Sequence, residues 1–257
     1  MMSQIENTFS LAGKTALVTG ASRGLGQAMA IGLAKAGAIV ICSSSKQGGC
    51  NATRGAITEI NGQSHELVAD LSQPEQVCAM AEKALGITGQ VDVLINNGGT
   101  IARSPAVDYP FEDWKQVMDV NIDAPFLLSQ IIGKRMVERG QGKIINIASM
   151  LSYTGGITVP AYAASKHAIV GLTKALANEW ASANVQVNAI APGYFRTDNT
   201  AALQADQERN KEIEKRIPAG RWGEPEQLSG AAVFLASRGS DYINGHVLAV
   251  DGGWLAR

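Results

Sequence analysis

Near its N-terminus the chain reads Thr15-Ala-Leu-Val-Thr-Gly-Ala-Ser-Arg-Gly-Leu-Gly26, an apolar run followed by three spaced glycines. The apolar run over Thr15–Thr19 predicts a buried strand, and the pattern over Gln27–Ala36 predicts a helix. Glycine lets the backbone turn tightly, and free N–H groups at the start of a helix attract phosphate. This order of strand, turn and helix favours a diphosphate-binding turn in a parallel sheet.

Further apolar runs rich in valine and isoleucine follow, and helical patterns separate most of them. Buried parallel strands read as continuous apolar runs, so the order predicts an α/β fold. We expect a Rossmann-like, doubly wound sheet of about seven parallel strands flanked by helices, in a single domain over residues 1–257. These further runs are Ile39–Cys42, Leu67–Val68, Val91–Ile95, Lys143–Ile147, Val185–Ile190 and Val247–Val250.

Composition narrows the class of protein. A net charge of −1 and a pI near 6.3 give no general attraction to nucleic acid or to an anionic membrane. No run approaches the length of a membrane span, and the first residues are neither basic nor apolar. The cysteines, Cys42, Cys50 and Cys78, are odd in number and the histidines are scattered, so we expect no metal and a reducing compartment. The expectation is a cytoplasmic protein without nucleic-acid or membrane partners.

Tyr162 and Lys166 lie four residues apart in a stretch, Pro160–Trp180, that predicts a long helix. This spacing places phenol and ammonium on one face, where the ammonium would lower the phenol pKa from about 10 towards working pH. Such a pair can run acid/base chemistry, although two solvated surface residues would give the same spacing. Ser149 follows an apolar run upstream and Asn121 lies in a helical stretch. Taken singly, these two could be a turn cap and an ordinary polar helix residue.

Together these motifs resemble the short-chain dehydrogenase/reductase family over nearly the whole chain. The resemblance implies an enzyme that interconverts a ketone and a secondary alcohol with NAD or NADP. Tyr162 would then be the proton donor, Lys166 would lower its pKa and bind the nicotinamide ribose, and Ser149 would bind the substrate oxygen. Asn121 would anchor a water that connects the lysine to solvent.

The same resemblance implies a cofactor site along the ends of the strands. Asp70 would meet the adenine amine, although a turn-capping role fits it equally well. Gly98 stands where the family more often has alanine, and keeps the small size that the cofactor demands. Pro192 and Gly193 would approach the nicotinamide, whose carboxamide Thr197 would bind. The full set of expected cofactor contacts is Gly20, Ser22, Arg23, Gly24, Leu25, Gly26, Ser44, Ser45, Lys46, Asp70, Leu71, Asn97, Gly98, Tyr162, Lys166, Pro192, Gly193 and Thr197.

The end of the second strand bears on the choice of cofactor, because a carboxylate there would bind the ribose of NAD and repel the phosphate of NADP. No acidic residue occurs between Glu6 and Glu59. A 2′-phosphate would instead find hydroxyl groups in Ser44-Ser-Lys46 and a cation at Arg23. We therefore expect NADP(H) to be preferred. If these cations are only solvated surface charges, NAD(H) would serve.

Longer stretches, such as Asn188–Tyr194 and Val250–Arg257, resemble the branch of the family that includes 2-dehydro-3-deoxy-D-gluconate 5-dehydrogenase. That resemblance implies a keto-sugar acid substrate from uronate degradation, with Arg103 binding its carboxylate and Arg221 or Arg257 as alternatives. A reductase of an unsaturated-uronate-derived ketone or a gluconate 5-dehydrogenase would fit the same residues. The alternatives are a 3-oxoacyl-carrier reductase, another carbonyl reductase, or a nucleotide-binding protein without catalysis. The branch is usually described as preferring NAD, which the acid-free region above does not match.

The resemblance also implies a homotetramer that forms through the Pro160–Trp180 helix and the helix before it. Trp254-Leu255 would pack on a neighbouring subunit and carry Arg257 towards its site. The alternative is that the apolar helix faces pack only on their own sheet. The polar stretch Tyr194–Pro218 predicts either a mobile segment over the site or a solvated helix pair.

Overall fold

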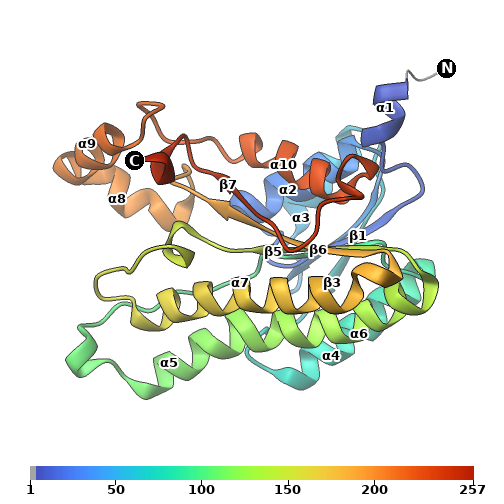
Figure 1. Ribbon diagram of the computed structural model, residues 1–257, viewed down its shortest axis with the longest axis horizontal. Coiled ribbons are helices and arrows are strands. Elements are labelled where there is room, and N and C mark those ends of the chain that lie inside the picture. The colour runs from blue at the N-terminus through green and yellow to red at the C-terminus, as the bar shows by residue number, and fades with distance from the viewer. Residues whose placement is uncertain (1–3) are drawn as a thin grey trace.

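A computed structural model describes residues 4–257 and shows one α/β domain built on a seven-stranded parallel sheet (Figure 1). The strand order is β3-β2-β1-β4-β5-β6-β7, so the direction of winding reverses between β1 and β4. This confirms the expected fold. The strands are β1 (Thr15–Val18), β2 (Ile39–Ser44), β3 (Ser64–Val68), β4 (Val93–Asn96), β5 (Gly142–Ile147), β6 (Val185–Pro192) and β7 (Val247–Val250).

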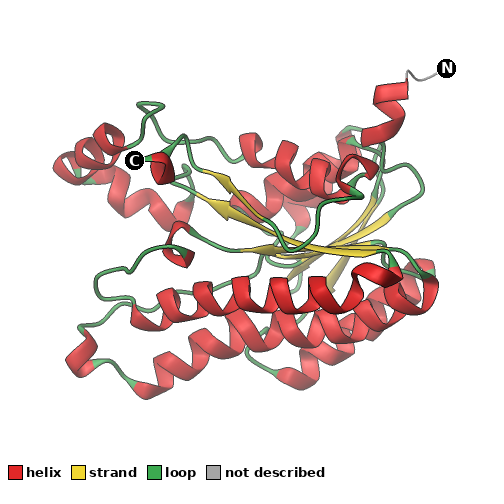
Figure 2. Ribbon diagram, viewed as in Figure 1, coloured by secondary structure: helices red, strands yellow, loops and turns green. Residues whose placement is uncertain are grey.

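Helices cover both faces of this sheet (Figure 2). One face carries α2 (Gly24–Lys35), α3 (Asn51–Glu59) and α10 (Glu226–Ala236). The other carries α4 (Pro74–Thr88), α6 (Ala124–Arg139) and α7 (Pro160–Trp180). The remaining α-helices are α1 (Gln4–Phe9), α5 (Phe111–Met118), α8 (Ala201–Ala205) and α9 (Gln207–Arg216). Within residues 4–257, no helix is both long and apolar enough to cross a lipid bilayer.

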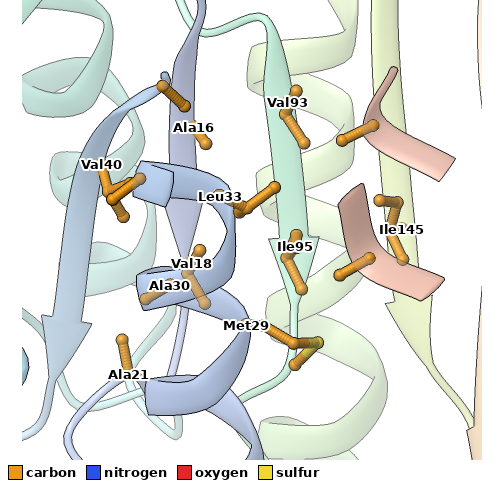
Figure 3. Packing of buried hydrophobic residues seen from close by; sticks show 14 of the residues in the cluster. Ala16, Val18, Ala21, Met29, Ala30, Leu33, Val40, Val93, Ile95 and Ile145 are labelled. Atoms are coloured by element: carbon orange, nitrogen blue, oxygen red, sulfur yellow. The ribbon is translucent and has the colours of Figure 1, made fainter. Parts of the chain in front are cut away.

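Alternate residues of each strand belong to the cores on opposite faces of the sheet, because successive strand side chains point to opposite faces. In β4, Val93 and Ile95 pack in the cluster under α2, whereas Leu94 packs in the cluster under α4 and α6. Figure 3 shows Met29 and Leu33 of α2 on the same side of the sheet as Val93 and Ile95. Burial on both faces explains why the central strands are apolar at most positions rather than at alternate ones.

The edge strand β3 departs from this pattern. It begins at Ser64 rather than at Leu67, and His65 pairs with Ile41 while Glu66 pairs with Cys42. Because β3 lies at the edge and is only partly covered, its first half needs no apolar side chains. A search for apolar runs therefore finds only the end of this strand.

The segment after β6 forms the helix pair α8 and α9, which lies beside the C-terminus in Figure 1. Ile213 and Ile217 pack with Trp222 and Trp254 in a third apolar cluster. Trp254 is thus buried within its own chain, and its ring centre lies 4.7 Å from that of Tyr194. Packing of Trp254-Leu255 on a neighbouring subunit stays a prediction.

Candidate active site

The reversal of strand order brings the ends of β1 and β4 together, where parallel α/β sheets bind ligands. The hydroxyl oxygen of Thr19 accepts hydrogen bonds from the backbone N–H groups of Asn97 and Gly98, at 3.0 and 2.9 Å. In return the side-chain amide of Asn97 donates to the carbonyl groups of Thr19 and Gly20, at 2.9 and 3.1 Å. Four hydrogen bonds therefore fix the glycine-rich turn against the Asn-Asn-Gly-Gly turn.

The glycine-rich turn is built for close backbone approach. Gly20 and Gly24 have φ angles of +63° and +56°, and a methyl group on Gly26 would overlap the carbonyl of Gly20. No side chain caps the N-terminus of α2, so the N–H groups of its first turn are free to face an anionic group. This cradle of bare backbone fits the diphosphate of a dinucleotide.

Gly98 has a specific reason for lacking a side chain. A methyl group there would overlap the side chain of Leu71, which follows the end of β3. Leu71 and Gly98, both expected at the cofactor site, are thus in direct contact. The glycine accommodates the larger neighbour rather than only loosening the backbone.

The expected phosphate site at the end of β2 is only partly assembled as the sequence suggested. Ser45, Lys46 and Arg23 are exposed, and the Arg23 guanidinium lies 3.7 Å from the Asp198 carboxylate. Ser44, however, is buried and its hydroxyl donates to the carbonyl of Lys46 at 2.9 Å. The single Ser44 hydroxyl hydrogen is thus used inside the turn here, and donation by Ser44 to a phosphate stays a prediction.

Glu66 is a residue of this region that the sequence analysis missed. It stands opposite Cys42 in the pairing of β2 with β3, and its carboxylate accepts hydrogen bonds from the N–H groups of Gly48 and Cys50, at 3.2 and 2.9 Å. A carboxylate does therefore lie near the end of β2, but backbone N–H groups occupy both of its oxygens. Only strand pairing could reveal it, because Glu66 is distant from β2 in sequence.

The other turns of the cofactor half are also formed. The Asp70 carboxylate accepts hydrogen bonds from the N–H and hydroxyl groups of Ser72, so it caps this turn, and its contact with the adenine amine stays a prediction. Pro192 ends β6, and the Gly193 N–H donates to the carbonyl of Val250 at 2.9 Å. Thr197 lies beside the glycine-rich turn, since a methyl group on Gly24 would contact its side chain at 3.5 Å.

The catalytic candidates meet at the ends of β4 and β5. Lys166 is buried, and its ammonium donates to the carbonyl of Ile147 at 2.7 Å while lying 5.5 Å from the centre of the Tyr162 ring. Ser149 follows the end of β5, accepts a hydrogen bond from the N–H of Leu151, and interacts with the Tyr162 phenol. The Ser149 hydroxyl thus caps a turn and also faces the tyrosine.

The pKa of Tyr162 differs from the expectation. Burial raises the pKa of this phenol above its usual value, while the hydrogen bond with Ser149 and the nearby charge of Arg103 act to lower it. Lys166 faces the ring and the Ile147 carbonyl, and burial lowers the pKa of its own ammonium to about 8. In this structure the groups that act to lower the phenol pKa are Ser149 and Arg103, and a lowering by Lys166 stays a prediction.

Asn121 lies in a single π-helical turn, Asp119–Asp123, between α5 and α6. Its side chain accepts a hydrogen bond from the N–H of Thr100 at 2.8 Å and donates to the Thr100 carbonyl and the Ser165 hydroxyl, both at 3.0 Å. It therefore ties the segment after β4 to α7, one turn away from Tyr162. Single π-helical turns often occur at functional sites.

Of the three arginines considered for a carboxylate, only Arg103 acts on Tyr162. Arg221 donates to the Trp222 carbonyl and the Gln227 side chain, both at 3.0 Å. Arg257 donates to the carbonyl groups of Lys215 and Arg216 at the end of α9. The last two arginines thus make contacts within their own chain, and the idea that Arg257 reaches a neighbouring site stays a prediction.

The cysteines and His167 are further titratable groups of the chain. Burial raises the pKa of the Cys42 thiol to about 12 and also raises that of Cys50, and all three cysteines are free. His167 is exposed on α7 and hydrogen-bonds the Ala163 carbonyl through Nδ1. Among residues 4–257, no group of three or more histidine, cysteine or acidic side chains gathers as metal ligands would.

Comparison with known proteins identifies the family. The model of the family described as enoyl-(acyl carrier protein) reductase matches residues 20–255. A relative from Bacillus subtilis (strain 168), named 2-dehydro-3-deoxy-D-gluconate 5-dehydrogenase, is 52% identical over 256 residues, with 100% of each chain covered. The chain belongs to the short-chain dehydrogenase/reductase family. It is an oxidoreductase, as the sequence analysis expected.

Solved structures of this family superpose closely on the chain. A protein from Agrobacterium tumefaciens, proposed to be a 2-deoxy-D-gluconate 3-dehydrogenase and crystallised with bound NADP, is 49% identical with a TM-score of 0.92, covering 98% of this chain and 100% of the other. A gluconate 5-dehydrogenase from Burkholderia cenocepacia J2315, in complex with NADP and tartrate, is 38% identical with a TM-score of 0.94, covering 99% and 100%.

Replacing Lys166 with methionine is expected to stabilise the short-chain dehydrogenase/reductase fold at pH 7 by roughly 1–3 kcal/mol. Burial lowers the pKa of Lys166 from 10.5 to about 8, so the buried charge destabilises the fold. This destabilisation has its full size below pH 8 and decreases progressively between pH 8 and pH 10.5. The gain should therefore disappear at high pH. Urea unfolding at several pH values measures it.

Lys174→Met is the matched control, because Lys174 is exposed on the same helix. It should leave the unfolding midpoint nearly unchanged at every pH. An equal gain in both variants would show that burial of the Lys166 charge is not its cause.

Proposed function

We propose that this enzyme is an NADP(H)-dependent dehydrogenase that interconverts a ketone and a secondary alcohol on a keto-sugar acid, of the 2-dehydro-3-deoxy-D-gluconate 5-dehydrogenase type. The observation that carries the proposal is the placement of Arg103, which is exposed on the segment after β4 and whose charge acts to lower the pKa of the Tyr162 phenol. A cation at the site of an acid/base group suits a small substrate that carries a carboxylate as well as a reacting carbonyl. The name of the 52% identical relative supports the same substrate class.

In the proposed mechanism Tyr162 donates its proton to the substrate oxygen during reduction and accepts it during oxidation. A bound nicotinamide cofactor supplies or accepts the hydride at the substrate carbon. Because burial raises the phenol pKa, Tyr162 is protonated at neutral pH and ready to donate. The Ser149 hydroxyl, which interacts with the phenol, would hydrogen-bond the same substrate oxygen and stabilise its developing charge.

Lys166 and Asn121 would form the path along which a proton is exchanged between the active site and solvent. The Lys166 ammonium would bind the nicotinamide ribose, and its pKa of about 8 lets it exchange a proton near working pH. A methyl group on Gly99 would lie 3.3 Å from the Asn121 side chain and 4.0 Å from the Lys166 ammonium, so the two polar groups flank this glycine. We propose that Asn121 anchors a water that connects Lys166 to solvent.

For the cofactor we propose NADP(H), with NAD(H) as a weaker alternative. Ser45, Lys46 and Arg23 are exposed around the end of β2 and would bind a 2′-phosphate. Glu66 already accepts hydrogen bonds from two backbone N–H groups, which reduces its capacity to bind a ribose hydroxyl as NAD would require. Structures of two relatives contain NADP, which supports this choice.

A second candidate substrate is gluconate or its 5-keto form. The relative crystallised as a gluconate 5-dehydrogenase holds tartrate, a small hydroxylated acid. Both candidates share a carboxylate and several hydroxyl groups, so Arg103 would serve either one. A ketone derived from an unsaturated uronate belongs to the same chemical class.

We also propose a cytoplasmic homotetramer. The three cysteines are free, which suits a reducing compartment. Phe126 on α6 and Phe111 on α5 are 42% and 67% exposed, and an interface between subunits would bury such aromatic rings. Helices α6 and α7 would form this interface, as the family resemblance implies.

Replacing Tyr162 with phenylalanine removes the proposed proton donor without changing the shape of the ring. Turnover of a keto-sugar acid should fall about 100-fold or more, while the dissociation constant of NADPH should stay within about threefold. Steady-state rates and fluorescence titration measure the two quantities. Turnover within a few-fold of the unmodified enzyme would show that another group donates the proton.

The cofactor and substrate class are tested by initial rates with NADPH and NADH on 2,5-diketo-3-deoxygluconate, an unsaturated-uronate-derived ketone, 5-ketogluconate and a 3-oxoacyl thioester. We expect faster turnover with NADPH on one of the acids. Arg23→Ala should raise the KM for NADPH about tenfold and leave that for NADH nearly unchanged, because only NADPH carries the 2′-phosphate.

Arg238→Ala, which changes an exposed arginine after α10, is the control and should alter neither KM. A preference for NADH would overturn the cofactor proposal, and turnover of the thioester alone would overturn the substrate class.

The tetramer is tested with Phe126→Asp, which places a charge on the proposed interface. Sedimentation velocity should show a tetramer for the unmodified enzyme and smaller species for this variant. Ile60→Asp, at the end of α3 and 38% exposed, is the matched control and should stay tetrameric. A monomeric unmodified enzyme would contradict the proposal.

A further inference from the structure

Thr158 has an unusual backbone conformation next to the proposed active site. Its φ angle is +62°, in the left-handed region that β-branched residues rarely adopt. In residues 4–257 the other non-glycine residues with positive φ are Asn61 and Asn184, and asparagine tolerates this conformation. Strain of this kind persists only where neighbouring contacts enforce it.

Two hydrogen bonds hold Thr158. Its carbonyl accepts a hydrogen bond from the N–H of Ser104 at 3.0 Å, and its hydroxyl donates to the carbonyl of Ile157 at 2.6 Å. The next residue, Val159, is buried, and α7 begins immediately after it at Pro160. The left-handed residue therefore joins the segment after β4 to the start of the helix that carries Tyr162.

The segment Thr100–Ser104 is held at alternate residues along its length. Asn121 binds both backbone groups of Thr100, and the Tyr109 hydroxyl donates to the carbonyl of Ala102 at 3.3 Å. The bond from Ser104 to Thr158 is the last of these. Arg103 lies between the last two attachment points, and its own side chain is exposed.

We propose that Thr158 is a specificity-determining positioning residue, whose left-handed backbone holds Ser104 and thereby directs Arg103 to the substrate carboxylate beside Tyr162. The inference rests on the proposed function and deepens it. The charge of Arg103 does act on the Tyr162 phenol, as this placement requires. Thr158 itself would touch neither substrate nor cofactor.

Three variants separate this role from general stability. Thr158→Val keeps the shape of the side chain but loses the hydroxyl bond to Ile157, so the left-handed conformation loses support. Thr158→Gly adopts positive φ without strain and should preserve the bond to Ser104. Arg103→Ala removes the proposed carboxylate contact directly.

The readouts are KM and kcat on a keto-sugar acid and on its uncharged methyl ester, both with NADPH. Thr158→Val should raise the KM for the acid about tenfold, while kcat for the acid and the KM for the ester stay nearly unchanged. For Thr158→Gly, the KM for the acid should stay within about threefold of the value for the unmodified enzyme. In the Arg103→Ala background, Thr158→Val should not raise the KM for the acid any further, because the guanidinium that Thr158 positions is absent.

A KM for the acid that rises equally in the presence and absence of Arg103 would overturn the inference. So would an equal rise for acid and ester. If Arg103→Ala leaves the KM for the acid unchanged, the carboxylate contact of the proposed function fails, and the positioning role fails with it.

Hydrogen exchange provides a readout that needs no substrate. The Ser104 amide should exchange about tenfold faster in Thr158→Val than in the unmodified enzyme, and at an unchanged rate in Thr158→Gly. Unchanged exchange in both variants would show that the left-handed residue does not hold the Arg103 segment, even if the enzyme turns over keto-sugar acids. Faster exchange in an enzyme that turns over no keto-sugar acid would overturn the specificity role, although Thr158 would still be shown to hold the backbone at Ser104.

Discussion

The hydrogen bonds between Thr19 and the Asn97-Gly98 turn are the constraint on which the site depends. Strands β1 and β4 lie side by side where the strand order reverses. The Thr19 hydroxyl accepts hydrogen bonds from the N–H groups of Asn97 and Gly98, just after the end of β4. The two turns can approach closely because both carry glycine at the contact. The glycine-rich turn and the segment that leads to Arg103 are thereby held in one rigid frame.

Around Tyr162, the fold holds three features that each cost conformational or electrostatic free energy. Lys166 is a buried cation, Asn121 lies in a π-helical turn, and Thr158 has a left-handed backbone. Each of these is less stable than the ordinary alternative, and each contacts or adjoins a residue of the proposed site. The sheet beneath supplies the compensation, because both of its faces are covered by apolar helices.

Local patterns in the sequence were sufficient for residues whose role depends on near neighbours. The strand–turn–helix order around Gly20, the fold class and the full extent of α7 were all predicted. Long-range effects were missed or misjudged. Glu66 reaches the turn after β2 only through strand pairing, and Trp254 is buried by residues of the α9 region that precede it by some forty positions. Neither arrangement leaves a signal at short spacing.

By itself the sequence determined the architecture, the family resemblance and the identity of the catalytic candidates, because apolar periodicity and short motifs encode local geometry. Only the tertiary structure decided how these groups behave. The pKa values of Tyr162 and Lys166 depend on burial, the Ser44 hydroxyl is used by a nearby carbonyl, and Arg103 rather than Arg221 or Arg257 acts on the phenol. Burial and charge proximity depend on atoms brought together from distant parts of the chain, so residue spacing alone does not specify them.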